Sequence, residues 1–154
     1  MKRLDALVAP AGLALKQYAM DYSGKFPVGD NAAGFNDLIK KDYLTDLRIY
    51  SCPSTTFKKG AEKTLSENNS SYIYFGGLTE LSGPDMPLVM DKTNNHDNYV
   101  NVLFIDGHVS GFNIPNATSC ENIVNYIKGD GYKPEQKKIL LDKAKKFDEQ
   151  FGYK

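Results

Sequence analysis

Residues 99–112 read YVNVLFIDGHVSGF, two runs of strand-forming residues on either side of one Asp-Gly pair. β-branched and aromatic residues favour strands. Asp-Gly suits a two-residue type I′ turn, in which both central residues take positive φ angles. The segment therefore predicts an antiparallel hairpin that turns at Asp106 and Gly107, with Ile105 and His108 in its strands.

Two shorter strand candidates precede this hairpin. Residues 71–75 (SYIYF) are rich in strand formers and end at two glycines, and residues 88–90 (LVM) lie between Pro87 and Asp91. Residues 49–53 also have an extended pattern that ends at Pro53. The middle of the chain is therefore expected to form a small antiparallel sheet.

The N-terminal residues have the pattern of an amphipathic helix. Apolar side chains recur at three- and four-residue steps up to Tyr22, and Ser23-Gly24 provides a stop. Pro10 lies inside this pattern, and proline disrupts a helix beyond its first turn. The pattern predicts a dependable helix from about Pro10 to Tyr22, preceded by a kinked extension or by frayed residues.

Three further helices are predicted. Residues 34–44 carry a short apolar stripe. Thr118 or Ser119 can cap a helix that carries Ile123 and ends near residues 129–131. Pro134 opens the last helix, since proline fits a first turn.

The order of these elements predicts an α+β protein: an N-terminal helix packed on a small antiparallel sheet, with C-terminal helices. A chain of 154 residues suits one hydrophobic core, so residues 1–154 are expected to form a single soluble domain. Its predicted parts are an N-terminal helix (1–23), a helix with loops (24–70), the sheet (71–113) and a C-terminal helical extension (114–154).

Charge and hydropathy exclude several classes of function. Lysine plus arginine and aspartate plus glutamate both number 19, so the chain lacks the basic surplus of a nucleic-acid-binding protein. No apolar run is long enough to span a bilayer. The N-terminus is not a signal peptide, because its apolar stretch contains Asp5 and lacks a small-residue cleavage site.

The residues that could carry chemistry gather around the hairpin. His96, Asp97, Asp106 and His108, with Asp91, could together supply metal ligands or an acid–base pair. The simpler interpretation is structural: Asp106 serves the turn, His108 begins the returning strand and His96 lies in a polar loop. The usual motifs for hydrolases, zinc proteases and nucleotide binding do not occur.

The loop after Asp91 also offers oxygen ligands of the kind that calcium prefers. The candidates are Asp91, Asn94 and Asp97, together with Asn95 and Asn98. Their spacing is not that of an EF-hand, so no cofactor is expected and calcium is kept as a secondary hypothesis.

Cys52 and Cys120 are the only cysteines. They lack the spacing of a zinc or redox site. One long-range disulfide and two separate thiols are both compatible with the sequence.

A family resemblance connects these features. His96, nine intervening residues and then Asp106-Gly107 match the H-x(9)-D-G signature of prepilin-like proteins with a processing-associated domain. Residues 15–27, 50–54 and 101–109 resemble, in order, the helix end, the Cys-Pro-Ser element and the hairpin of that family. The resemblance covers about residues 10–113.

This resemblance implies a type IV pilin-like fold similar to the major pseudopilin of type II secretion, general secretion pathway protein G. Such proteins have a leader cleaved by a prepilin peptidase and an apolar half-helix that anchors them in the inner membrane and packs in a filament. Neither feature occurs here, so we expect the chain to be the extracytoplasmic domain of an inner-membrane-anchored precursor in the cell envelope. That setting favours a disulfide between Cys52 and Cys120.

Two functional hypotheses follow. The first is a non-enzymatic, pseudopilin-like structural subunit that contacts other pilin or pseudopilin subunits through its N-terminal helix and exposes its sheet and loops. The second is an extracytoplasmic binding module or hydrolase that uses His96, Asp106 and His108, with polysaccharide as a candidate ligand.

Overall fold

The computed structural model describes residues 2–50, 65–66, 70–92, 99–115, 118–128 and 133–153. Its elements, in chain order, are α1 (Lys2–Asp21), α2 (Ala32–Lys40), the 3-10 helix η1 (Leu47–Tyr50), β1 (Tyr72–Tyr74), the 3-10 helix η2 (Glu80–Ser82), β2 (Pro87–Asp91), β3 (Tyr99–Phe104), β4 (Val109–Asn113), α3 (Cys120–Lys128) and α4 (Pro134–Phe151). The strands form one antiparallel sheet in the order β1-β2-β3-β4. The α+β class is confirmed, with two helices before the sheet and two after it.

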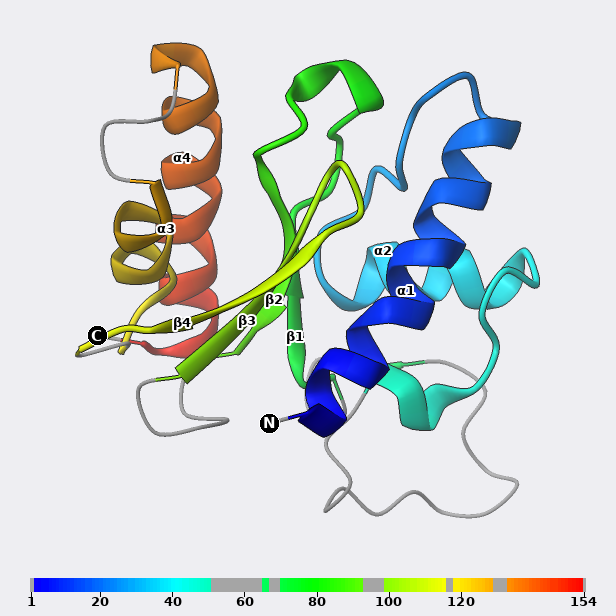
Figure 1. The fold of residues 1–154 in the computed structure, drawn as a ribbon, viewed down its shortest axis with the longest axis horizontal. Coiled ribbons are helices and arrows are strands. Elements are labelled where there is room, and N and C mark those ends of the chain that lie inside the picture. The colour runs from blue at the N-terminus through cyan, green and yellow to red at the C-terminus, as the bar shows by residue number, and fades with distance from the viewer. Residues whose placement is uncertain are drawn as a thin grey trace.

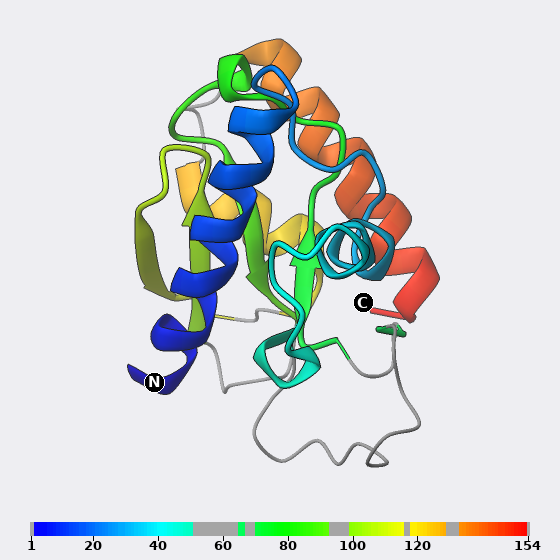
Figure 2. The same cartoon turned by 90° about the vertical axis from the view of Figure 1, so that its right-hand side faces the viewer.

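The sheet lies between two layers of helices. In Figure 1, α1 and α2 lie on one side of the strands and α3 and α4 on the other, and Figure 2 views the molecule from the side of α1 and α2. Every residue of β1 and β2 is buried, and so is β3 after its first residue. The expectation of an exposed sheet is therefore wrong for these strands, because helices cover both faces. Only β4, at the edge, is largely accessible.

α1 packs across the sheet through one stripe of small and apolar side chains. Gly12 allows the close approach, since a Cβ there would lie 3.0 Å from a methyl group of Leu103 in β3. The residues before Pro10 are helical as well, so of the two alternatives the helical extension is the one observed. Ser23 and Gly24 have positive φ angles and end the helix as predicted. The buried residues of the stripe are Ala11, Ala14, Leu15, Tyr18 and Ala19.

The β3–β4 hairpin forms, but its turn differs from the predicted one. The Gly107 N–H donates to the Phe104 carbonyl at 2.9 Å, and the Phe104 N–H donates to the His108 carbonyl at 2.9 Å. Gly107 has a φ of 96°, whereas Asp106 is not at positive φ. The connection is thus a three-residue loop, which needs a positive φ only at its glycine. Ile105 lies in this loop and His108 closes it opposite Phe104, just before β4 begins at Val109, so neither residue is part of a strand.

The prediction of an extended segment at residues 49–53 is wrong where it can be checked. Ile49 and Tyr50 belong to η1, and residues 51–53 lie outside the described residues. Tyr50 is buried and its hydroxyl donates to the Leu44 carbonyl at 2.9 Å. Anchoring this ring in the core favours a turn of helix over an extended chain.

Both C-terminal helices begin where their signals predicted. Ser119 Oγ accepts the Asn122 N–H at 3.1 Å, as a helix cap does. The Asp148 carboxylate of α4 accepts the Cys120 N–H at 2.6 Å, so α4 also caps α3. Pro134 is in the first turn of α4.

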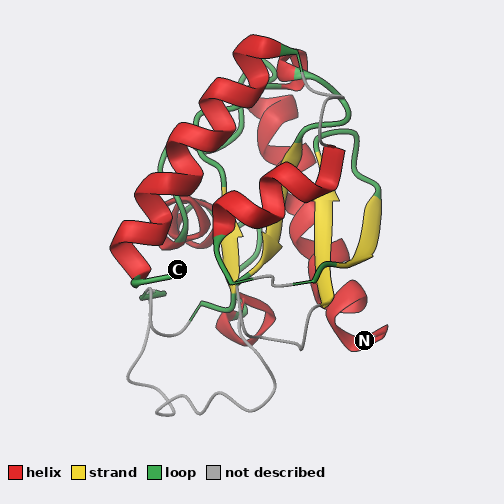
Figure 3. Ribbon diagram, turned by 90° about the vertical axis from the view of Figure 1, so that its left-hand side faces the viewer, coloured by secondary structure: helices red, strands yellow, loops and turns green. Residues whose placement is uncertain are grey.

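α4 belongs to the common core and is not an appendage. Phe147 is fully buried, and its ring centre lies 5.7 Å from that of Phe75, beside β1. Lys143 Nζ lies 2.8 Å from the Asp30 carboxylate, which ties α4 to the segment before α2. Figure 3 views the molecule from this C-terminal layer. The extension therefore covers the second face of the sheet.

Candidate functional site

The structure describes only part of the predicted site. Asp91, Asp106, Gly107, His108 and Cys120 are described. The remaining predicted residues lie outside the described residues: Cys52, Asn94, Asn95, His96, Asp97 and Asn98.

Asp106 and His108 form an exposed pair on the hairpin loop. The His108 N–H donates to Asp106 Oδ1 at 3.0 Å, and His108 Nδ1 contacts the same oxygen. The imidazole also stacks on the Phe104 ring, with ring centres 4.4 Å apart and planes 10° apart. The ring orientation is thus fixed from two sides, and among the described residues no partner occupies its Nε2.

The charge of Asp106 is stabilised by this arrangement. Burial is the largest single influence and raises the pKa of the carboxyl group. Hydrogen bonds from the backbone and ring of His108, followed by the nearby charges of His108 and Lys16, outweigh burial and hold the pKa below its ordinary value of 3.8. Asp106 is therefore ionised at neutral pH.

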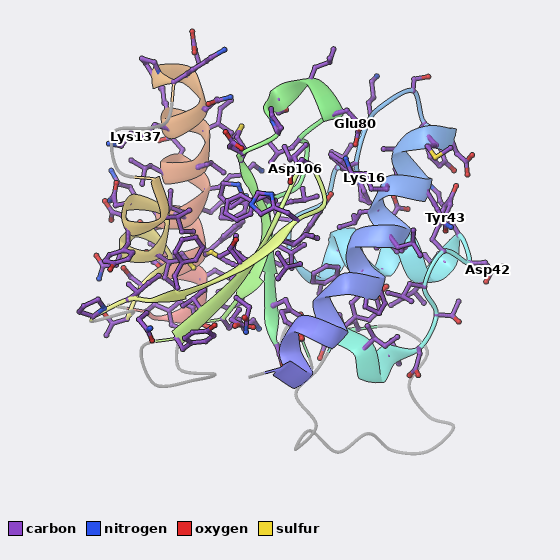
Figure 4. All side chains as sticks on the ribbon, viewed as in Figure 1. Lys16, Asp42, Tyr43, Glu80, Asp106 and Lys137 are labelled. Carbon is purple, nitrogen blue, oxygen red and sulfur yellow. The ribbon has the colours of Figure 1, made fainter. Side chains whose placement is uncertain are left out.

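An ion pair next to the hairpin was not predicted. Lys16 of α1 places its Nζ 2.8 Å from the Glu80 carboxylate of η2, and its Cε lies 3.8 Å from where a Gly107 Cβ would be. Figure 4 shows Lys16, Glu80 and Asp106 converging from three separate elements. Lys16 and Glu80 also line a hollow of about 360 Å³ beside Met20. Lys16 and Glu80 are 64 positions apart, so no local pattern could reveal the contact.

This cluster can orient an imidazole and carry charge, but a metal site needs further ligand side chains. No group of three or more histidine, cysteine, aspartate or glutamate side chains is arranged to hold a metal in the parts of the chain that are described. The Asp106–His108 contacts are also those that a hairpin loop uses to order itself. The structural interpretation of this pair therefore accounts for its observed geometry.

Asp91 is part of the sheet. It is the last residue of β2 and is fully buried. Its Oδ2 accepts hydrogen bonds from the backbone N–H of Asn101 at 2.8 Å and from the Asn101 side chain at 3.2 Å. These contacts join β2 to β3, which favours a structural role for a residue first considered as a calcium ligand.

Cys120 is a buried thiol. Burial is the main cause that raises its pKa, and the neighbouring Asp148 carboxylate adds to the effect. A raised pKa disfavours the nucleophilic thiolate. Its pairing with Cys52 stays a prediction, since Cys52 lies outside the described residues.

The outer face of α1 carries exposed apolar side chains. Leu13 is 63% exposed and Met20 83% exposed, and the exposed Gln17 lies between them on the same face. Positions 13, 17 and 20 are four and three residues apart, so they form one stripe on the side opposite the packed residues. We call this stripe the outer face of α1.

Tyrosines close the junction between α1 and the segment after α2. The Tyr18 and Tyr22 rings stack with centres 4.2 Å apart, and Lys41 Nζ lies 4.7 Å from the centre of the Tyr22 ring. The Tyr43 hydroxyl donates to the Asp21 carboxylate. That hydrogen bond is the main cause that raises the pKa of Tyr43 to about 12. The junction fixes the C-terminal end of α1 and with it the outer face.

No family model matches this chain, and no curated protein or solved structure matches it. The pilin-like resemblance therefore stays an expectation from the motif residues. No helix in the described ranges is both long and apolar enough to cross a membrane.

Proposed function

We propose that this protein is a non-enzymatic, pseudopilin-like structural subunit of a type II secretion or type IV pilus-like assembly in the cell envelope. Its partners are other pilin or pseudopilin subunits, which it contacts through the outer face of α1. The chain acts outside the cytoplasm, and a precursor segment that precedes it supplies the inner-membrane anchor.

The observation that carries this proposal is the division of α1 into two faces. One face is held on the sheet by Ala14, Leu15 and other buried residues, while Leu13 and Met20 are left exposed on the other. Full burial of a leucine or methionine side chain is worth about 1.5–3 kcal/mol. A neighbouring helix that covers both side chains would gain the larger part of that contribution at each, since Leu13 is 63% and Met20 83% exposed, and this suits lateral packing of helices.

The experiment replaces both apolar residues of the outer face by arginine. The Leu13→Arg/Met20→Arg double variant should keep the fold, because both side chains are exposed, but should lose assembly. The full-length protein in its native cells is fractionated, and its membrane complexes are separated by size under native conditions. The wild-type protein is expected in the inner membrane and in complexes well above the subunit mass, and the double variant as a free subunit.

Leu81→Arg is the matched control, because Leu81 is 96% exposed in η2 and is not part of α1. This variant should assemble like the wild type. A wild-type protein found only as a free subunit, or a double variant that still assembles, contradicts the proposal.

The exposed Asp106–His108 pair favours a second candidate function, an extracytoplasmic binding module or hydrolase. His108 is oriented by Asp106 and Phe104 and presents its Nε2 away from both contacts. The His96→Ala/His108→Ala double variant tests this function. Loss of a bound metal or of hydrolysis with folding intact would favour the second candidate, and a change in thermal stability alone would reject it.

A further inference from the structure

α3 carries a hollow that the proposed assembly does not use. The hollow measures about 390 Å³, and its described lining consists of Ile114 and Pro115, which follow β4, and of Asn122, Asn125 and Tyr126. Asn125 and Tyr126 follow Asn122 by three and four positions, so all three lie on one face of α3. Small-molecule sites in proteins commonly have volumes of about 300–1,000 Å³.

The three α3 side chains that line this hollow, those of Asn122, Asn125 and Tyr126, are exposed and do not pack the helix onto the core. Ile123 and Val124 are fully buried and pack the helix onto the core. Tyr126 is 52% exposed and Asn125 is also exposed, and neither side chain has a partner in the described part of the chain. Large aromatic side chains normally bury their rings. An exposed tyrosine beside an unengaged amide is therefore available to a ligand.

The chemistry of the lining selects a neutral, hydroxylated ligand. None of the described residues that line the hollow is charged, so neither an anion nor a cation finds a counter-charge. An asparagine amide both donates and accepts hydrogen bonds, as a pair of vicinal hydroxyl groups requires. Tyr126 and Pro115 supply exposed apolar surface for a ligand face made of C–H groups, while Ile114 is buried at the base of the hollow.

We propose that this hollow binds a neutral saccharide. The Tyr126 ring packs against the C–H face of one sugar residue, and the amides of Asn122 and Asn125 hydrogen-bond to its hydroxyl groups. The Asn122 amide nitrogen also lies 3.4 Å from Thr118 Oγ1, which holds this side chain at the rim.

The hollow is remote from the outer face of α1. α3 and α1 lie on opposite sides of the sheet (Figure 1). A subunit that assembles through α1 would keep α3 accessible, and a subunit that does not assemble would have the same hollow. Saccharide binding is therefore independent of the proposed function, and either proposal can fail alone.

The test begins with an array of neutral and anionic oligosaccharides, probed with the purified 154-residue chain. The neutral probes are cello-, malto-, chito- and galacto-oligosaccharides, and the anionic probes are uronic-acid and sulfated oligosaccharides. We expect binding to at least one neutral class, with a dissociation constant in the range of roughly 0.1–1 mM because the hollow is open. The strongest neutral oligosaccharide is then titrated by NMR.

Variants at the hollow separate the proposed contacts. Tyr126→Ala should weaken binding about tenfold, since an aromatic contact contributes of this order, while Tyr126→Phe should retain most of the affinity. Asn125→Asp should weaken binding because the carboxylate no longer donates a hydrogen bond. Leu81→Ala, at an exposed position in η2 away from the hollow, should bind like the wild type.

The proposal is overturned if no neutral oligosaccharide binds at millimolar concentration, or if only anionic probes bind. It is also overturned if Tyr126→Ala binds the neutral probe as the wild type does. Thermal melts of each variant check that a loss of binding is not a loss of folding.

Discussion

Replacing Phe147 by alanine should lower the free energy of unfolding by about 3–5 kcal/mol, the range measured for buried phenylalanines. Phe147 is 0% exposed, and its ring centre lies 5.7 Å from that of Phe75. Removing the ring takes away apolar contacts and leaves a cavity between α4 and the sheet, where a rigid core can close only in part. A domain of this size has a total stability of about 5–15 kcal/mol, so the change should be large.

Urea unfolding followed by far-ultraviolet circular dichroism measures this loss, since the chain has no tryptophan for fluorescence. Phe151→Ala is the matched control: it lies one turn further along α4 but is only partly buried, so its loss should be clearly smaller. A loss below about 1 kcal/mol for Phe147→Ala would refute the claim that α4 completes the core. So would unfolding in two steps, with the C-terminal helices melting first.

Three further predictions concern the packing of α2, the hairpin loop and a tyrosine. Gly34→Ala should lower the free energy of unfolding in urea by about 1–3 kcal/mol, because the new Cβ would lie 2.4 Å from the ring of Tyr74 in β1. Gly12→Ala should lower it less, since its Cβ meets only the flexible end of Leu103. An equal loss for both variants would contradict this packing. In an NMR pH titration the Asp106 carboxyl should titrate below 3.8 and return toward that value in His108→Ala. The lowered pKa of Asp106 stabilises the folded state by a small amount at pH values above 3.8, and this stabilisation is lost as the pH falls through the pKa of the folded state. A titration midpoint of Asp106 that is the same in His108→Ala as in the wild type would contradict the role given to His108. Tyr43 should ionise near pH 12 in an assigned NMR titration. Its hydrogen bond to Asp21 therefore stabilises the fold fully below pH 10, and this stabilisation is lost as the pH rises toward 12. Ionisation of Tyr43 at pH 10 would refute the hydrogen bond.

The elements with strong local signals could be predicted from the sequence. The hairpin strands, the strand around Ile73 and the helix that opens at Pro134 are all confirmed. Each depends on residues within a few positions of one another, such as a proline in a first turn or an Asp-Gly pair between strand formers. Even so, the details of the hairpin turn could not be read from the pair itself, because two- and three-residue loops both accept a glycine at positive φ.

Tertiary contacts account for what the sequence could not show. Lys143 and Asp30 are 113 positions apart, and no pattern signals their contact. Asn31 has a similar hidden role: its side-chain oxygen accepts the Tyr74 N–H at 3.0 Å, and its own N–H donates to the Tyr74 carbonyl at 3.0 Å. It thereby occupies the open edge of β1 in place of another strand.

The candidate site could be predicted only in outline. Asp106 and His108 were identified as neighbours because they are two positions apart on one turn. The contribution of Lys16 to that site depends on how α1 crosses the sheet, and the hollow beside Tyr126 depends on which side of α3 faces the core. Both are consequences of packing that amphipathic periodicity does not resolve to single residues.

Photocrosslinking from α1 tests most directly whether this chain is an assembly subunit. A benzoyl-phenylalanine introduced at position 13 or 20 of the full-length protein reports any chain that lies against the outer face in the native cell, and the same group at Ile139 of α4, 45% exposed, serves as the control. We predict a ladder of crosslinked subunits from positions 13 and 20 and none from position 139. Illumination that yields only uncrosslinked protein from both α1 positions, or equal ladders from all three, would contradict assembly through α1.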